Sequence, residues 1–159
     1  MEIRFAKVSD APLIHDLMMN AFMIYKDEAP PSSALEETVQ FVSTALKEGE
    51  ECLIGFVDHL PVGMVRFQFI EEGIYFYRLS VIPEKQGQGI AKNLLKSLEE
   101  YAFNVGVHTL LCKVRMTVPK NIYLYSSIGY KIYNEEVVHK PNGIKIKVAL
   151  MQKNLSLLT

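Results

Sequence analysis

Apolar and polar positions follow two different periods along the chain, and the changes of period divide it into elements. Residues 3–8 alternate with a period of two, which predicts a strand, and residues 9–12 then supply a cap and an early proline for a helix. The apolar stripe of that helix is Leu13, Ile14, Leu17, Met18, Ala21 and Phe22. Residues 33–36 read Ser-x-x-Glu, a capping box that predicts a second helix ending near Gly49.

The middle of the chain changes to the period of strands. Residues 51–57 and 62–70 flank a short turn and predict a hairpin, and a second turn leads into a strand at 74–82. Residues 89–105 return to helical spacing, and 109–115 form another strand. The apolar stripe of this helix is Ile90, Leu94, Leu98, Tyr101 or Ala102, and Val105. Strand, helix and strand in this order predict a right-handed parallel crossover.

The last third of the chain predicts a short helix and a hairpin. Pro119 opens the helix and Gly129 ends it. Residues 144–148 alternate strictly, and the Pro-Asn-Gly sequence at 141–143 favours a type I′ turn. Three lysines accompany this hairpin, namely Lys140, Lys145 and Lys147. They fit the solvated face of a strand better than a basic binding patch.

Composition narrows the class of protein. A chain of 159 residues fits one domain, 1–159, with a core of its own. With 17 basic against 18 acidic residues, the charge balance argues against a nucleic-acid surface. Neither a run of about 18 apolar residues nor a signal-peptide core is present, so we expect a cytoplasmic protein without a membrane partner. Cys52 and Cys112 lack metal-ligand spacing and are predicted to be reduced, buried thiols.

The segment 81–92 carries the clearest candidate chemistry. A strand end passes through a proline into a turn with Gly87 and Gly89, and the turn opens directly into a helix. Free N–H groups at a helix N-terminus suit a phosphate or pyrophosphate, and glycines let the backbone approach it. Asn93 follows Lys92 and stands where a dinucleotide fingerprint has its third Gly or Ala, so neither that motif nor a Walker loop fits. A turn that merely connects strand and helix is the alternative.

Two motifs at the expected separation resemble those of a known family. Gln86-x-x-Gly89-x-Ala91 resembles the coenzyme-A-binding motif of the GNAT superfamily of N-acetyltransferases. The sequence LYSSIGY at 124–130 is similar to that family's Leu-Tyr-x-x-x-Gly-Phe. The predicted order of elements also follows the GNAT fold, so the resemblance covers nearly the whole chain.

This resemblance implies an α/β (α+β) fold, a mixed, mostly antiparallel sheet of about seven strands with a splayed parallel strand pair and four helices. It implies acetyl-CoA as co-substrate and no metal. A backbone N–H at the end of the strand before the turn would hold the oxyanion, and that strand would pair with the pantetheine arm. The implied cofactor-binding residues are Leu79, Ser80, Val81, Gln86, Gly87, Gln88, Gly89, Ile90, Ala91, Lys92 and Asn121.

Tyr125 matches the tyrosine that serves as general acid in the family, and the alternative is a ring that packs the short helix. The family often has Asn seven residues before this tyrosine, where this chain has Val118. Asn121 lies four residues before Tyr125, so it either substitutes for the missing contact to the cofactor or caps or decorates the first turn of the helix. Lys113 aligns with a glutamate base of ribosomal-protein and protein N-terminal acetyltransferases. Lysine is a poor substitute, and the base stays unassigned.

The predicted function is therefore transfer of an acetyl group from acetyl-CoA to a primary amine of a small molecule or peptide by direct attack. The alternative is a non-catalytic acyl-CoA-binding sensor or interaction module on the same fold. A homodimer is the candidate assembly. Family acceptors bind near residues that correspond here to Tyr25, Asp27, Glu28, Glu135, Glu136 and His139. These acids either attract a cationic amine or are ordinary surface charges.

Overall fold

The structure is a computed structural model that describes residues 1–27, 32–141 and 143–155. Within this described part, seven strands form one mixed sheet in the order β1-β2-β3-β4-β5-β7-β6, accompanied by four α-helices. The strands are β1 Glu2–Phe5, β2 Glu51–Val57, β3 Leu60–Ile70, β4 Gly73–Val81, β5 Thr109–Arg115, β6 Lys131–His139 and β7 Lys145–Asn154. The helices are α1 Ala11–Phe22, α2 Val39–Lys47, α3 Ile90–Asn104 and α4 Pro119–Ser127. The α/β class and the mixed sheet predicted from the sequence are confirmed.

The chain divides into two compact units, and the prediction of a single domain over 1–159 stays a prediction. The first unit comprises 1–68 and 76–100, and the second comprises 69–75 and 101–159. Four short 3-10 helices also belong to the first unit. They are η1 Val8–Asp10, η2 Met23–Tyr25, η3 Ser33–Glu36 and η4 Pro83–Lys85.

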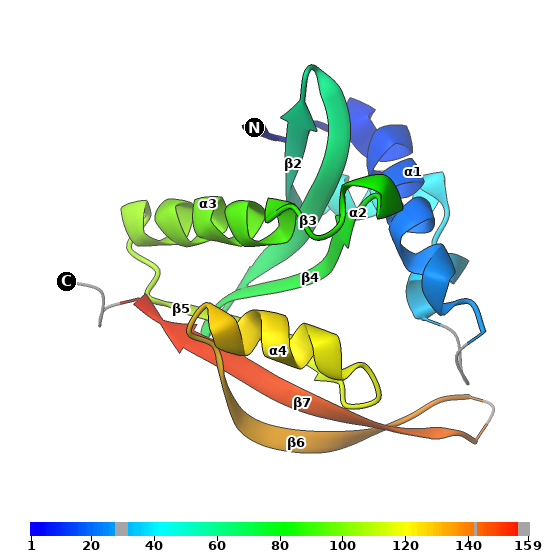
Figure 1. Ribbon diagram of the computed structural model, residues 1–159, viewed down its shortest axis with the longest axis vertical. Coiled ribbons are helices and arrows are strands. Elements are labelled where there is room, and N and C mark those ends of the chain that lie inside the picture. The colour runs from blue at the N-terminus through cyan, green and yellow to red at the C-terminus, as the bar shows by residue number, and fades with distance from the viewer. Residues whose placement is uncertain (28–31, 142, 156–159) are drawn as a thin grey trace. The chain divides into compact units, whose positions relative to one another are not determined.

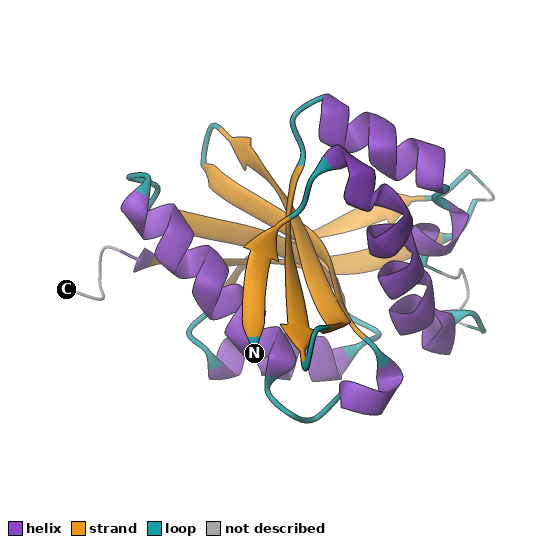
Figure 2. Ribbon diagram, turned by 90° about the horizontal axis from the view of Figure 1, so that it is seen from above, coloured by secondary structure: helices purple, strands orange, loops and turns teal. Residues whose placement is uncertain are grey.

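In the first unit, helices cover both faces of the strands (Figures 1 and 2). β1, β2 and β3 pair in antiparallel fashion, and the apolar faces of α1 and α2 pack on one side of them. That core contains Ala11, Ile14, Leu17, Met18, Ala34, Val42, Cys52, Ile54 and Met64. On the other side, Leu94 of α3 lies against Gly55 and Gly63. A Cβ at Gly63 would lie 2.7 Å from the Ser80 carbonyl oxygen and 3.2 Å from Leu94 Cδ1. Gly63 therefore lets both β4 and α3 approach closely.

The second unit is built on β5, β7 and β6, with α4 in contact with β5 (Figure 1). The start of β4 pairs in parallel with β5, where Ile74 lies opposite Leu110 and Tyr75 opposite Leu111. This short register agrees with the predicted splayed pair. In β7, Ile146 and Val148 are buried whereas Lys145 and Lys147 are exposed. These two lysines therefore lie on the solvated face, as predicted, and Asn142 of the predicted turn lies outside the described residues.

The predicted first strand is too long. It ends at Phe5, and Val8–Asp10 forms a 3-10 turn instead. The Asp10 carboxylate accepts a hydrogen bond from the Lys7 N–H at 2.8 Å and pairs with Arg4 at 2.8 Å. Asp10 therefore stabilises this turn, and its side chain does not cap α1.

The predicted capping box at 33–36 is also wrong. These residues form the 3-10 helix η3, and the second α-helix begins only at Val39. Its cap is Thr38, whose Oγ1 accepts the Phe41 N–H at 3.0 Å. Both Ser33 and Thr38 carry a hydroxyl and precede apolar residues. The Ser-x-x-Glu spacing alone therefore assigns the N-cap to the wrong residue. Val105 is a smaller error: it lies beyond the end of α3 and is 49% exposed.

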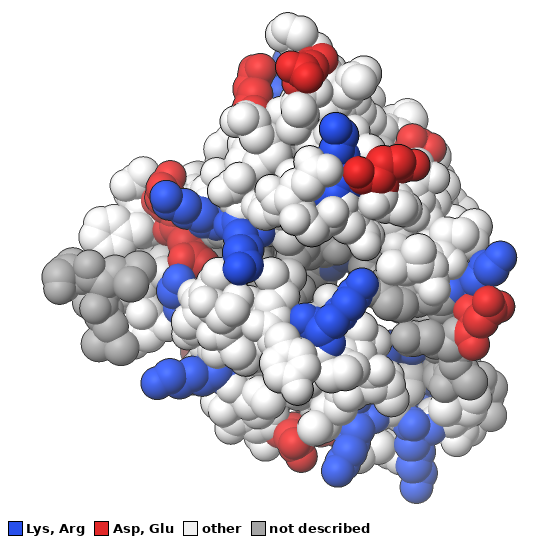
Figure 3. Space-filling model, viewed as in Figure 1, with Lys and Arg blue, Asp and Glu red and all other residues white. Residues whose placement is uncertain are grey.

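Both cysteines are free and buried, as predicted. Burial raises the pKa of Cys52 and raises that of Cys112 to about 12, so both thiols stay protonated at neutral pH. On the face shown in Figure 3, acidic and basic side chains are interspersed with uncharged ones. None of the described helices combines the length and apolar character that a membrane span requires.

Candidate functional site

The turn between β4 and α3 has the shape that its two glycines predict. Gly87 and Gly89 both have φ of +80°, a left-handed conformation that glycine adopts without strain. The Gln86 side chain folds back and donates a hydrogen bond from Nε2 to the Val81 carbonyl at 3.2 Å. The first helical hydrogen bond of α3 runs from the Asn93 N–H to the Gly89 carbonyl at 3.0 Å. The turn is thus tied to the strand behind it and to the helix in front.

This turn presents an open row of backbone N–H groups. Among the described residues, the N–H groups of 87–92 have no hydrogen-bond partner, and a Cβ added at Gly87 or Gly89 would meet no atom within 4 Å. Gln86 to Gly89 and Lys92 are exposed, whereas Ile90 is buried and anchors the helix. Unpaired N–H groups at the positive end of a 15-residue helix suit a pyrophosphate. The residues present therefore fit the implied cofactor.

The end of β4 meets this turn in an unusual conformation. Arg78 has φ of +55°, a left-handed conformation that is strained for any residue with a Cβ and that interrupts the extended strand before Leu79. Ser80 is buried, and its hydroxyl donates to the Arg78 carbonyl at 2.8 Å. The Ile82 N–H donates to the Val62 carbonyl of β3 at 2.9 Å. The segment 79–81 is therefore fixed on both sides.

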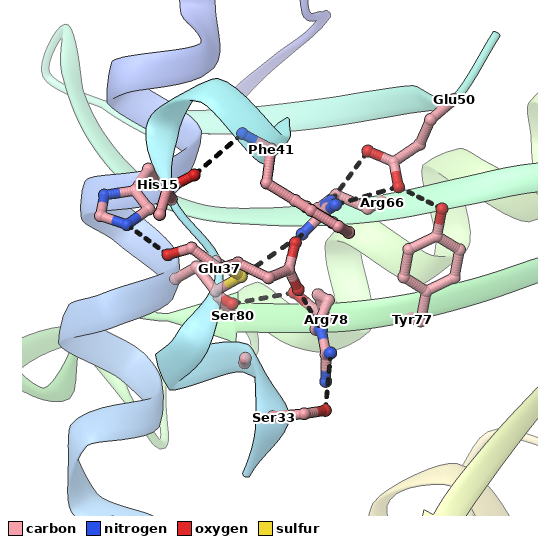
Figure 4. Close-up of polar contacts among 12 residues, drawn as sticks. His15, Ser33, Glu37, Phe41, Glu50, Arg66, Tyr77, Arg78 and Ser80 are labelled. Carbon is pink, nitrogen blue, oxygen red and sulfur yellow. Dashed lines mark hydrogen bonds and ion pairs between the residues drawn. The ribbon is translucent and has the colours of Figure 1, made fainter. Parts of the chain in front are cut away.

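A group of mostly buried charged residues lies beside the segment 79–81, on β4, on the neighbouring strand β3 and on nearby loops. Figure 4 shows how these residues face one another. This arginine–glutamate cluster consists of Glu37, Glu50, Arg66 and Arg78. Arg66 on β3 binds Glu50 through Nε at 2.9 Å and Nη2 at 3.1 Å, and it binds Glu37 through Nη1 at 2.8 Å. Arg78 binds the other oxygen of Glu37 through Nε at 2.8 Å. The Arg66 residue is only 1% exposed, so its charge requires these partners.

Neighbouring groups complete the cluster. The Tyr77 hydroxyl donates to Glu50 and accepts from Gln68 Nε2, the latter at 2.8 Å. Burial, followed by the contact with Glu50, raises the pKa of Tyr77. Burial alone would lower the pKa of Arg66, but hydrogen bonds and charge from Glu50 and Glu37 outweigh it and raise that pKa. The Arg66 guanidinium is therefore charged at neutral pH.

The second unit holds the other predicted site residues. Tyr125 on α4 is 8% exposed, and its ring contacts Tyr130 edge-on at a centroid distance of 6.0 Å. Tyr123 is 73% exposed, which sets the two tyrosines of this helix apart. Asn121 is half-buried, and no side chain caps the start of α4. Asn121 therefore lies in the first turn of α4, and its contact with a cofactor stays a prediction.

The candidate acids of the acceptor site come from different elements: Asp27 follows η2, whereas Glu135 and Glu136 lie on β6. Glu136 is bound to Lys113 at 2.9 Å, and this hydrogen bond raises the pKa of Lys113. Lys113 therefore stays protonated and is unsuited to act as a base. Asp27, Glu135 and His139 are exposed, Tyr25 ends the 3-10 helix η2, and Glu28 lies outside the described residues.

Sequence reasoning missed the arginine–glutamate cluster. Arg66 stands inside the apolar run 62–67, where every residue is buried. A lone charge at such a position requires a buried partner, and this signal could have marked the site. Its partners Glu37 and Glu50 lie 29 and 16 residues away, so only the fold brings them together.

Comparisons with known proteins agree with this geometry. The sequence profile of the Acetyltransferase (GNAT) family matches residues 13–130. Spermidine N(1)-acetyltransferase of Vibrio cholerae is 26% identical over 144 residues, covering 82% of this chain and 78% of that protein. Human N-acetyltransferase 8B is 30% identical over 92 residues, covering 58% of this chain and 40% of that protein. The chain therefore matches less than half of this human relative.

Solved structures share the fold. The ribosomal-protein-S18-alanine N-acetyltransferase from Escherichia coli superimposes with a TM-score of 0.78 at 18% identity, over 97% of this chain and 93% of the other. The Salmonella typhimurium protein yncA, solved with its cofactor acetyl-CoA, has a TM-score of 0.70 at 20% identity, over 98% and 94%. At these identities the likeness establishes the fold alone.

Proposed function

Because the chain belongs to the acetyltransferase (GNAT) family, we propose that it transfers an acetyl group from acetyl-CoA to a primary amine. The acceptor is a small molecule or a peptide, and the amine attacks the thioester directly. The observation that carries this proposal is the open row of N–H groups at 87–92. That row supports binding of an anionic cofactor at the N-terminus of α3.

The cofactor-binding residues divide by what each supplies. Backbone N–H groups of 87–92 bind the pyrophosphate, and Gln86 holds the turn in shape through the Val81 carbonyl. The strand segment 79–81 pairs with the pantetheine arm, as an added strand does, and one of its N–H groups donates to the oxyanion. Asn121 supplies a further polar contact to the cofactor. These roles are proposals that the fixed geometry of the turn and strand supports.

The reaction requires proton transfers at the amine and at the thiolate. A lysine-like amine has a reference pKa of about 10.4, so it must first lose a proton to attack the thioester carbonyl as the free base. After attack, the nitrogen passes a proton to water, because no side chain is assigned as the base. The C–S bond then breaks, and the departing thiolate, with a reference pKa of about 8.5, takes a proton. Tyr125 supplies that proton, because a tyrosine near a pKa of about 10 is a suitable donor to a thiolate. Acetyl-CoA contributes the acyl group and the thiol leaving group.

Two kinds of relative indicate the range of acceptors. One is a spermidine acetyltransferase and another acts on ribosomal-protein alanine, so both small amines and peptide amines are candidates. We further propose that the chain works as one domain over 1–159, in the cytoplasm, with a homodimer as the candidate assembly. A non-catalytic acyl-CoA sensor on the same fold is the competing function.

Thiol release from acetyl-CoA separates the enzyme from the sensor. The wild-type protein should release coenzyme A with at least one member of a panel of polyamines, aminoglycosides, amino acids and peptides. Tyr125→Phe keeps the ring but removes the proton donor, so turnover should fall by roughly 10²- to 10⁴-fold while acetyl-CoA affinity hardly changes. Binding of acetyl-CoA without release from any acceptor would establish the sensor instead.

The control for this variant is Tyr123→Phe. Tyr123 lies on the same helix, but its side chain is exposed, and its hydroxyl should matter little. Equal, small losses in both variants would mean that the thiolate leaves without help, and Tyr125 would then be a packing residue.

A further inference from the structure

We propose that Arg78 binds an anionic group of the acceptor, so that the preferred substrate is an α-amino acid or a similar amine with a carboxylate beside the nitrogen. This inference rests on the proposed function and adds a substrate class to it. It follows from the position of Arg78, from its unused hydrogen-bond donors and from the charge balance of the cluster behind it.

The position of Arg78 is the first step. It directly precedes the segment 79–81, where the thioester carbonyl would be held, and its φ of +55° interrupts the extended strand at this point. Its side chain extends to η3, where Nη2 donates to Ser33 Oγ at 3.0 Å (Figure 4). An amine that attacks a thioester held at 79–81 must come within a few ångströms of that strand. The guanidinium is thus within reach of groups attached near the amine.

The donors of Arg78 are the second step. A guanidinium has five N–H donors, and Arg78 uses Nε to bind Glu37 and one N–H of Nη2 to bind Ser33. Within the described part of the chain, Nη1 has no partner. The Arg78 side chain is 25% exposed, whereas those of Arg66, Glu37 and Glu50 are 2%, 8% and 3% exposed. The group that the cluster presents to its surroundings is therefore a guanidinium edge, which matches a carboxylate.

Charge balance is the third step. The cluster holds two arginines and two glutamates, and each glutamate is already bound to an arginine. No carboxylate of this cluster is left to attract a polyamine. A nearby guanidinium also disfavours a second positive charge, so it lowers the pKa of an amine placed beside it. Arg78 therefore binds the carboxylate of an α-amino acid and at the same time favours the free amine, in a site where no base is assigned.

The experiment is a two-by-two comparison of enzyme and acceptor. Thiol release is measured for wild type and Arg78→Gln with glycine, L-alanine, L-methionine and L-phenylalanine, each beside its carboxamide. Loss of a charged hydrogen-bonded pair should lower kcat/KM for the amino acids by roughly 10- to 100-fold more than for the carboxamides, mostly through KM. For each enzyme, kcat/KM for the amino acid is divided by kcat/KM for its carboxamide, and the ratio for the variant is then compared with that for wild type. Effects of the different amine pKa values and of general damage from the substitution cancel in this comparison.

Arg78→Lys provides a second variant that keeps the charge. It should retain part of the selectivity for carboxylates, because lysine attracts an anion but cannot bind it in bidentate fashion. If the preference for amino acids over carboxamides changes by less than about twofold in both variants, this inference is overturned. Release of coenzyme A in the same assays would still uphold the proposed function. Preference of the wild type for polyamines, unchanged by Arg78→Gln, would also overturn it. Absence of release from every acceptor would overturn the proposed function itself.

Discussion

The turn at 82–92 and the arginine–glutamate cluster lie at the two ends of the strand segment 79–81, and they differ in the chemical groups that form them. The turn uses backbone N–H groups, is open to solvent and comes from one continuous stretch of chain. The cluster uses side chains, is buried apart from Arg78, and joins the residue after η3 and the residue before β2 to residues of β3 and β4. We propose that the first region receives an anion and that the second fixes the strand that holds the acyl group.

This difference predicts how each region responds to change. A backbone site tolerates substitution of its side chains but depends on φ angles that only glycine adopts easily. A buried charge cluster tolerates no single removal, because the remaining partner is left without compensation. Substitutions in the turn should therefore affect ligand binding first, and substitutions in the cluster should affect stability first.

The largest expected effect belongs to the cluster. Arg66→Met keeps most of the aliphatic length of the side chain but leaves Glu50 buried without its principal cation. The free energy of unfolding should fall by about 3–5 kcal/mol, as measured by urea denaturation. The matched control is the double variant Arg66→Met/Glu50→Gln, which removes both charges and should recover part of that loss. If the single variant is as stable as wild type, the cluster does not hold the fold in this region.

The next effect tests the turn and has an internal control. Gly89 and Gly106 have φ of +80° and +81°, and neither has an atom within 4 Å of an added Cβ. Valine at either position should lower stability by about 1–2 kcal/mol, because a left-handed φ disfavours a β-branched residue. Only Gly89→Val should also weaken acetyl-CoA binding, by at least roughly tenfold, because its side chain enters the proposed ligand space. Equal affinities in the two variants, measured by calorimetry, would place the cofactor elsewhere.

The smallest effect concerns the rim of the cluster and depends on pH. Tyr77→Phe keeps the ring beside Arg66 but removes the hydroxyl between Gln68 and Glu50, so stability at pH 7 should fall by about 1 kcal/mol. Folding raises the pKa of Tyr77 above its value of about 10 in the unfolded chain. The hydroxyl therefore makes its full contribution to the free energy of unfolding below about pH 10, and this contribution is lost as the pH rises further. The stability gap between wild type and variant should therefore narrow above pH 10. A gap that is constant to pH 11 would contradict the assigned contact.

The same contrast explains what the sequence could predict. The sequence predicts the turn because its glycines, the strand before it and the helix after it are adjacent in the chain. The predicted bounds of the strands 51–57 and 109–115 also agree with the observed ones. The sequence does not predict the arginine–glutamate cluster, because its ion pairs join residues up to 41 positions apart. The capping box failed for a related reason: Ser33 Oγ is bound by Arg78, a tertiary partner that local spacing does not reveal.

The central claim is that the turn at 87–92 binds the pyrophosphate of acetyl-CoA. Thermal unfolding of the wild-type protein with acetyl-CoA or with adenosine tests it most directly, because a ligand that binds only the folded state raises Tm by mass action. Acetyl-CoA at millimolar concentration should raise Tm, and adenosine, which lacks the pyrophosphate, should not. An unchanged Tm with acetyl-CoA, or an equal shift with adenosine, would contradict the claim.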